Sequence, residues 1–68
     1  MAARDRIVTP VKHLKTGDVI ADLTRGMIVV ETKVQLVNGG WGVYYKVQFT
    51  GEYGRVNYSP HSEVLVVK

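Results

Sequence analysis

A chain of 68 residues is long enough for one small domain, which buries only about 60% of the surface that its unfolded chain exposes. It has no cysteine, so neither disulfide bonds nor a thiolate zinc site can supplement the core. Its apolar runs are far shorter than the roughly 20 residues of a membrane span, and its charged N-terminus argues against a secretory signal. We therefore expect a soluble, cytoplasmic domain that has no membrane partner.

The net charge of +3 gives the chain a mild preference for anionic partners. This charge permits binding to DNA or RNA without requiring either. The basic residues are scattered along the chain rather than grouped in a block. Any positive patch must therefore be assembled by folding.

The first part of the chain predicts little regular structure. Residues 1–12 show neither a helical stripe nor steady alternation, and we expect a mobile N-terminal arm or a weakly held extension before a small β-barrel domain at residues 13–68. Within this domain, residues 15–18 predict a turn and residues 19–23 a first short strand.

A long β-branched run at residues 27–36 follows a short turn and alternates with the period of two of a half-buried strand. Its predicted inward positions are Ile28, Val30, Thr32, Val34 and Leu36. Its predicted outward positions are Glu31, Lys33 and Gln35. Met27 and Val29 share the outward register, although they are apolar.

Three glycines and an Asn predict a flexible loop at residues 37–42, with Trp41 inside it. The next strand, residues 43–50, alternates again. Val43, Tyr45, Val47 and Phe49 are expected inside, and Tyr44, Lys46 and Gln48 outside. Together the two long strands predict a hairpin.

A second tight turn is expected at residues 51–54, with Tyr53 exposed in it. Beyond it, Arg55 and Asn57 point outward, and Val56 and Tyr58 point inward. Ser59 can cap a one-turn helix that has Pro60 at its first position. The closing strand is then expected at residues 63–67.

These features predict an all-β fold, a closed five-stranded barrel with a one-turn helix before the last strand. The arrangement resembles the Src-homology-3-like small barrel, whose relatives include Tudor and KOW modules. The resemblance covers residues 14–67. The segments Leu14-Lys-Thr-Gly-Asp-Val-Ile20 and Tyr58-Ser-Pro-His-Ser-Glu-Val64 also resemble those of small uncharacterised proteins of actinobacteria and their phages. The turn at residues 24–26 lacks the acidic, extended loop that polyproline recognition would require.

The sequence offers no arrangement typical of catalysis. Its carboxylates are widely spread, and His13 and His61 have no ligand spacing to other residues. Ser59 and Ser62 flank His61, but neighbours on one helical turn point in different directions. We therefore expect a protein that is not an enzyme, with no metal, cofactor or small-molecule substrate.

The outward residues of the three central strands combine cations, an aromatic ring and amides. Cations suit phosphates, an exposed aromatic ring suits base stacking, and amides can reach bases or sugars. The predicted nucleic-acid site consists of Lys33, Tyr44, Lys46 and Arg55, with Trp41 from the adjacent loop. The alternative is an ordinary solvated sheet face, on which Glu31 neutralises Lys33 or Lys46.

A second functional hypothesis is a protein-interaction or assembly module, including a homodimer. Several apolar side chains are not explained by the core and could form an exposed patch, or be covered by the N-terminal arm. This candidate surface consists of Met27, Val29, Trp41, Leu65 and Val67. Trp41 is either a lid over one end of the barrel or an exposed anchor for a partner.

Overall fold

The computed structural model of the chain describes residues 5–68. Its strands and its one-turn 3₁₀ helix are β1 (Arg6–Pro10), η1 (Val11–His13), β2 (Val19–Asp22), β3 (Gly26–Gln35), β4 (Trp41–Val47), β5 (Tyr53–Tyr58) and β6 (Glu63–Val67). The strands form one sheet in the order β1-β6-β2-β3-β4-β5, and all neighbouring pairs are antiparallel. The prediction of an all-β fold is confirmed.

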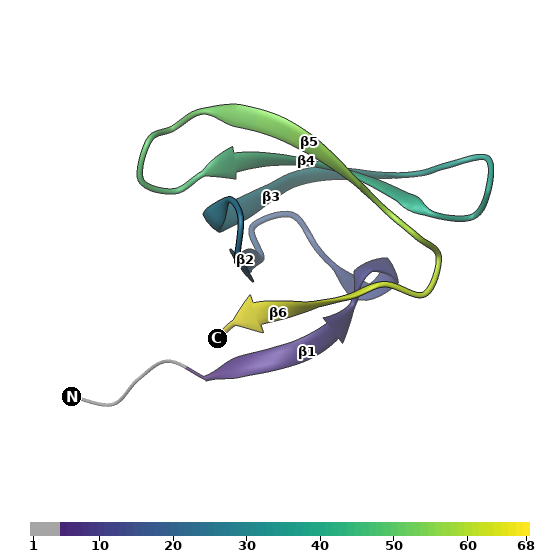
Figure 1. Ribbon diagram of the computed structural model, residues 1–68, viewed down its shortest axis with the longest axis horizontal. Helices are drawn as coiled ribbons and strands as arrows, with labels where there is room; N and C mark the ends of the chain where they lie inside the picture. Colours follow the sequence, from purple (N-terminus) through teal and green to yellow (C-terminus); the bar gives the residue numbers. More distant parts are fainter. Residues whose placement is uncertain (1–4) are drawn as a thin grey trace.

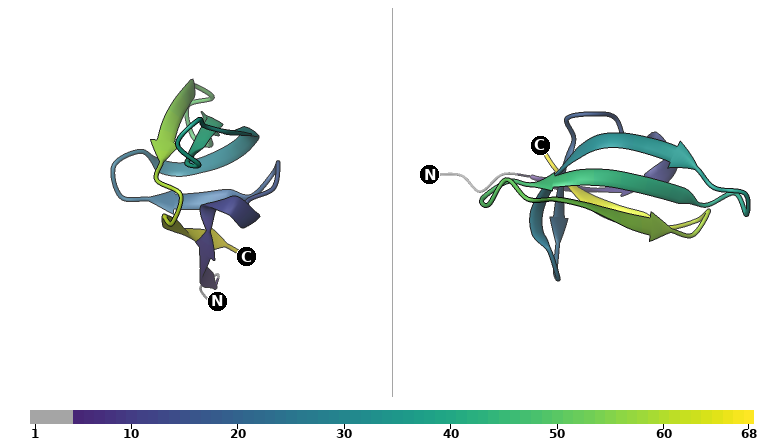
Figure 2. Two further views of the ribbon diagram at one scale, coloured as in Figure 1. Left: turned by 90° about the vertical axis from the view of Figure 1, so that its right-hand side faces the viewer. Right: turned by 90° about the horizontal axis from the view of Figure 1, so that it is seen from above.

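The sheet is curled but not closed. In Figure 1, β3, β4 and β5 lie above β2, and β6 and β1 lie below it. Seen end-on, the strands follow one another around an open curve from β5 to β1 (Figure 2). Within residues 5–68, β1 pairs only with β6 and β5 only with β4. The prediction of a closed five-stranded barrel is therefore wrong, because a sixth strand extends one edge and the two edges do not meet.

The sixth strand comes from the segment expected to be a mobile arm. Residues 6–10 form β1 and pair along their length with β6, from Arg6 opposite Val67 to Pro10 opposite Glu63. β-branched residues favour this pairing, because they fit a pleated and half-buried surface. The expectation of a mobile arm is wrong for residues 6–10, and residues 1–4 of the predicted arm lie outside the described residues.

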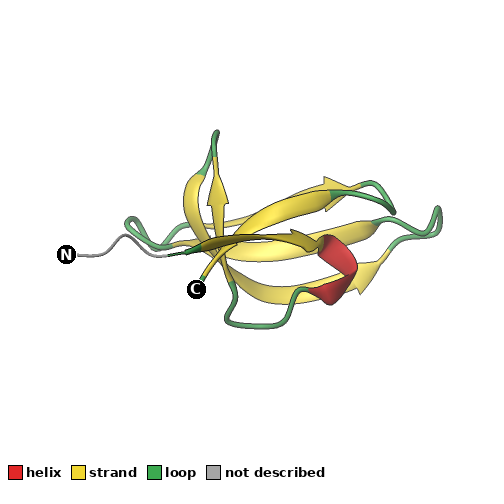
Figure 3. Ribbon diagram, turned by 90° about the horizontal axis from the view of Figure 1, so that it is seen from below, coloured by secondary structure: helices red, strands yellow, loops and turns green. Residues whose placement is uncertain are grey.

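The helical turn also differs from its predicted place. It lies at η1, directly after β1, where the Leu14 N–H donates to the Val11 carbonyl at 3.0 Å (Figure 3). Residues 59–62 instead form a turn, in which the Ser62 N–H donates to the Ser59 carbonyl at 3.2 Å. The Ser59 and Ser62 hydroxyl groups lie 2.7 Å apart. Ser59 therefore closes a turn rather than capping a helix.

The core lies on the inner side of the curled sheet and draws on both halves of the chain. Its buried side chains are Val11, Leu14, Ile20, Ile28, Val30, Val43 and Val66. Tyr45, Val56 and Tyr58 are partly buried and pack against this cluster, as their inward alternation predicts. Phe49 does not. β4 ends at Val47, and Phe49 lies in the following turn with 86% of its surface exposed.

Candidate nucleic-acid interface

A β-bulge at Glu31 decides which side chains share the outer face of the sheet. Val30 lies opposite Tyr45 and Thr32 opposite Tyr44, so Glu31 is an extra residue in β3. The turn at residues 15–18 holds this irregularity in place. The Gly17 N–H donates to the Val30 carbonyl at 2.8 Å, and the Thr16 hydroxyl to the Glu31 carbonyl at 3.1 Å. Beyond the bulge, the inward and outward positions of β3 are exchanged.

Lys33 consequently lies on the inner side, opposite buried Val43. Its Nζ donates to the carbonyl oxygens of Val11 at 3.1 Å and Lys12 at 2.6 Å. Partial burial lowers the pKa of the Lys33 amine, against the opposing charge of Asp18. The outward position that alternation predicts for Lys33 is therefore wrong, and Lys33 does not share a face with Tyr44, Lys46 and Arg55. The same bulge leaves Val34 exposed, although alternation predicts it inside.

Trp41 is also absent from the outer face. It is the first residue of β4, opposite Gln35 and Tyr58, and it is partly buried against the core. The Lys33 amine lies 4.6 Å from the centre of its ring. Of the two predicted roles, this position agrees with the lid and not with an exposed anchor.

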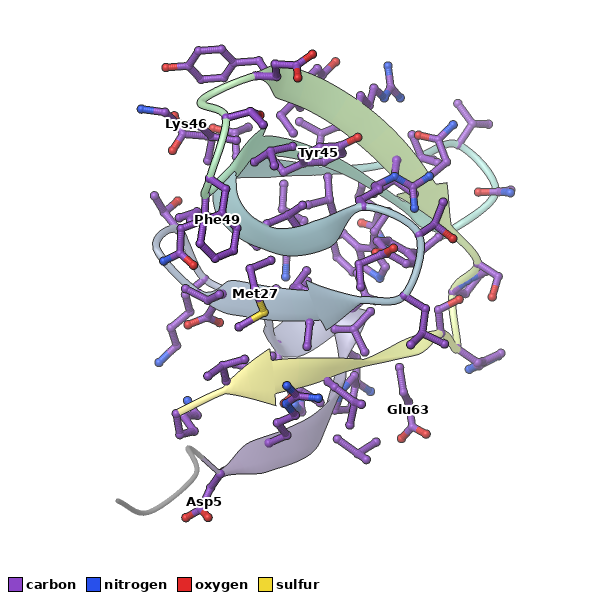
Figure 4. The ribbon with its side chains drawn as sticks, turned by 60° about the vertical axis from the view of Figure 1, so that its left-hand side comes forward. Asp5, Met27, Tyr45, Lys46, Phe49 and Glu63 are labelled. Carbon is purple, nitrogen blue, oxygen red and sulfur yellow. The ribbon has the colours of Figure 1, made fainter. Side chains whose placement is uncertain are left out.

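The other three predicted residues share one surface. Tyr44 lies directly opposite Arg55, and Lys46 two residues along β4 lies opposite Tyr53. Tyr44 is 40% and Tyr53 is 71% exposed. Lys46 and its neighbour Tyr45 point to different sides of β4 (Figure 4). We define the outer patch as Tyr44, Lys46, Tyr53, Arg55 and Asn57.

Arg55 is held in a fixed position at the centre of this patch. Its Nε donates to the Asn57 Oδ1 at 3.1 Å, and its Nη1 to the Tyr44 hydroxyl at 3.2 Å. Its guanidinium carbon lies 5.2 Å from the centre of the Tyr44 ring, within cation–π range. Gly42 leaves room for it, because a Cβ at that position would lie 2.9 Å from Nη2 of Arg55. Arg55 is therefore positioned against β4 before any ligand arrives.

Lys46 and Tyr53 repeat this pairing one step along the strands. The Lys46 amine lies 5.7 Å from the centre of the Tyr53 ring. Tyr53 is not among the predicted site residues, because the glycines at 51 and 54 predict a turn there, whereas the structure places Tyr53 at the start of β5. The alternation of Tyr53, Arg55 and Asn57 was the available signal, since every second residue of a strand faces the same side.

In the described part of the chain, the cations of the outer patch have no acidic partner within 4.0 Å. Among residues 5–68, the one ion pair within 4.0 Å joins Arg25 and Asp22 in the turn between β2 and β3. The alternative in which Glu31 neutralises Lys46 therefore finds no support. An exposed cation without a carboxylate partner is available for an external anion.

Four of the five residues of the predicted protein-interaction surface share the outer side of the sheet, since they alternate with the buried residues Ile28 and Val66, but Trp41 does not join them. Val29 and Val67 both lie opposite Val19 on the outer side of β3, β2 and β6, and both are partly buried. Leu65 is 39% exposed, and Met27 is partly buried on the same side of the molecule as exposed Phe49 (Figure 4). Trp41 packs elsewhere, against the core.

The concave features of the surface lie away from the outer patch. One of them, with a volume of about 500 Å³, lies beside η1 and is lined in part by Lys12, His13, Lys15 and Asp18. Across residues 5–68, no three His, Asp or Glu side chains gather in a way that could hold a metal ion. The described part of the chain also has no helix with the length and apolarity needed to cross a membrane. No family model, curated protein sequence or solved structure matches this chain.

Proposed function

We propose that this chain is a non-catalytic binding module for nucleic acid and that it binds through the outer patch. The observation that carries the proposal is Arg55, an exposed cation that is held by Tyr44 and Asn57 and has no carboxylate within 4.0 Å among residues 5–68. Such a guanidinium group can bind a phosphate with little loss of side-chain freedom. Lys46 supplies a second cation on the same face.

The surrounding residues supply the other contacts that nucleic acids require. Tyr44 and Tyr53 offer exposed rings for bases, and Asn57 offers an amide that can reach bases or sugars. The proposed site therefore keeps Tyr44, Lys46 and Arg55 from the sequence analysis and adds Tyr53 and Asn57. Lys33 and Trp41 are not included, because both face the inside of the fold.

The sharpest test moves Arg55 without removing its charge. In Gly42→Ala, the new Cβ would overlap the present position of the guanidinium group, whose flexible end must shift. We expect this variant to bind a labelled oligonucleotide several-fold more weakly in fluorescence anisotropy at low salt. The double charge reversal Lys46→Glu with Arg55→Glu should abolish binding. Lys15→Glu is the control outside the patch, because it reverses one charge at an exposed position, the same change as Lys46→Glu makes alone.

Salt dependence tests the same proposal independently. With two phosphate contacts, the logarithm of the association constant should fall against the logarithm of the salt concentration with a slope of about −1.4 to −1.8. Lys46→Met, which removes one phosphate contact, should reduce the magnitude of this slope by about 0.7 to 0.9. The proposal is wrong if the wild-type protein binds no oligonucleotide at low salt, or if Lys15→Glu weakens binding as much as the double reversal does.

One observation favours a second candidate function, assembly with another copy of the chain. At the β1 edge of the sheet, Val8 is 59% exposed and lies directly opposite Leu65, which is 39% exposed. Val8→Asp with Leu65→Asp should then convert a dimer to a monomer in analytical ultracentrifugation. A wild-type protein that is monomeric at high concentration would exclude this candidate.

The resemblance to Src-homology-3-like modules is likewise a proposal. The long β3–β4 hairpin and the short turn before the last strand support it. The nucleic-acid proposal does not depend on it, since it follows from the outer patch alone.

A further inference from the structure

We infer that the outer patch binds single-stranded nucleic acid in preference to a duplex, with bases stacked on Tyr53 and Tyr44. This inference rests on the proposed function and names the form of nucleic acid that the site accepts. It follows from the spacing of the two rings, their exposure and the small number of cations beside them.

The two rings lie on a diagonal of the sheet. Tyr44 is opposite Arg55, and Tyr53 is opposite Lys46 on the next outward pair, so Tyr44 and Tyr53 are diagonal neighbours. Diagonal neighbours in an antiparallel pair are about 7–8 Å apart. Bases in a duplex are stacked about 3.4 Å apart along each strand, and their faces are covered by the adjacent bases. Rings at this spacing can meet base faces only when the strand is unpaired and extended.

Each ring has its own cation. Arg55 lies 5.2 Å from the centre of the Tyr44 ring, and Lys46 lies 5.7 Å from the centre of the Tyr53 ring. Rings and cations therefore alternate across the two strands, so that a base on a ring has a cation beside it for its phosphate. Guanidinium groups also stack on bases, so Arg55 extends the surface that Tyr44 presents.

The small number of cations points the same way. Lys46 and Arg55 are the two cations of the outer patch, and binding to the backbone of a duplex gains its strength from many phosphate contacts. Two such contacts give weak binding unless stacking adds to them. Stacking requires accessible base faces, which a single strand has and a duplex lacks.

The test compares single strands of about ten nucleotides, as DNA and as RNA, with the DNA duplex of the same sequence. Binding is measured by fluorescence anisotropy at low salt and at equal phosphate concentration. We expect at least one of the single strands to bind about tenfold more tightly than the duplex. Equal or tighter binding of the duplex would overturn the inference.

Two substitutions at Tyr53 separate stacking from simple apolar contact. Tyr53→Phe keeps the ring and should bind the single strand within about twofold of wild type, whereas Tyr53→Leu should bind about 5- to 100-fold more weakly. Phe49→Leu is the matched control, because Phe49 is an exposed aromatic residue outside the patch. In nuclear magnetic resonance spectra, stacked bases should shift the ring protons of Tyr53 upfield.

The outcomes separate this inference from the proposed function. If the duplex binds and the double charge reversal abolishes its binding while Tyr53→Leu has no effect, the proposed function stands and the single-strand inference fails. If neither single strand nor duplex binds, both fail. If single strands bind tightly and Tyr53→Leu alone among the Tyr53 and Phe49 variants loses affinity, both are supported.

Discussion

Lys33 illustrates how one cation can stabilise the fold rather than bind a ligand. Its amine donates to the carbonyls of Val11 and Lys12. Methionine has an unbranched side chain of similar length, but it lacks the amine that donates these hydrogen bonds. We expect Lys33→Met to lower the free energy of unfolding by about 1–3 kcal/mol, because hydrogen bonds to a charged donor are lost. Urea denaturation measures this change.

Lys46→Met is the control for this prediction. The Lys46 side chain is exposed and donates no hydrogen bond among the described residues, so the free energy of unfolding should change by no more than about 0.5 kcal/mol. Equal stability of the two variants would show that the bonds from Lys33 contribute nothing net to folding. The comparison also separates the two lysines that the sequence pattern places on the same face.

At the scale of single elements, the turn between β2 and β3 depends on Asp22. Its carboxylate accepts the N–H groups of Thr24 and Arg25, each at 2.8 Å, and pairs with the Arg25 side chain at 3.2 Å. Partial burial acts to raise the pKa of Asp22. The hydrogen bonds from Arg25 and Thr24 and the charge of Arg25 outweigh burial, so this pKa lies below its ordinary value of 3.8.

The lowered pKa of Asp22 determines how the stability of the fold changes with pH. The carboxylate of Asp22 stabilises the fold in full above pH 3.8, and this contribution is lost as the pH falls through the lower pKa of the folded state. We expect Asp22→Asn to cost about 1 kcal/mol of unfolding free energy at pH 7 and less as the pH falls below 3.8. Chemical denaturation at a series of pH values measures this difference. A difference that is constant with pH would contradict the prediction.

β3 shows where sequence reasoning succeeds and where it fails. Alternation predicts a long strand, and it predicts Ile28 and Val30 inside correctly. It fails after Glu31, because the bulge is held by hydrogen bonds from Thr16 and Gly17, which are distant in sequence. Local periodicity cannot reveal such contacts. The residues of the candidate site likewise divide into those that alternation predicts and those that depend on contacts distant in sequence. Tyr44, Lys46 and Arg55 lie in regular strands and were predictable, whereas the inward position of Lys33 was not.

At the scale of the whole molecule, the all-β class follows from composition and alternation, but the number of strands does not. β1 pairs with β6, although the two strands lie near opposite ends of the sequence. Its own sequence carries no alternation that would indicate this partner. The space that Gly42 provides for Arg55 likewise becomes visible only once β4 and β5 are in register.

The open sheet predicts an unequal distribution of stability. β3 and β4 each have neighbours on both sides and supply buried Ile28, Val30 and Val43. β1 has a neighbour on one side within residues 5–68, and its Ile7 and Val8 are largely exposed. Strands with few buried contacts open locally at a lower free energy than central strands do.

Amide hydrogen exchange measures this difference residue by residue. We expect the hydrogen-bonded amides of β1 to be at least about tenfold less protected than those of β3 and β4, because β1 can separate from β6 without exposing the main core. The other edge strand, β5, should show intermediate protection, since its Val56 and Tyr58 pack against the core. Equal protection of β1 and Val43 would contradict this order and would mean that the open sheet unfolds as a single cooperative unit.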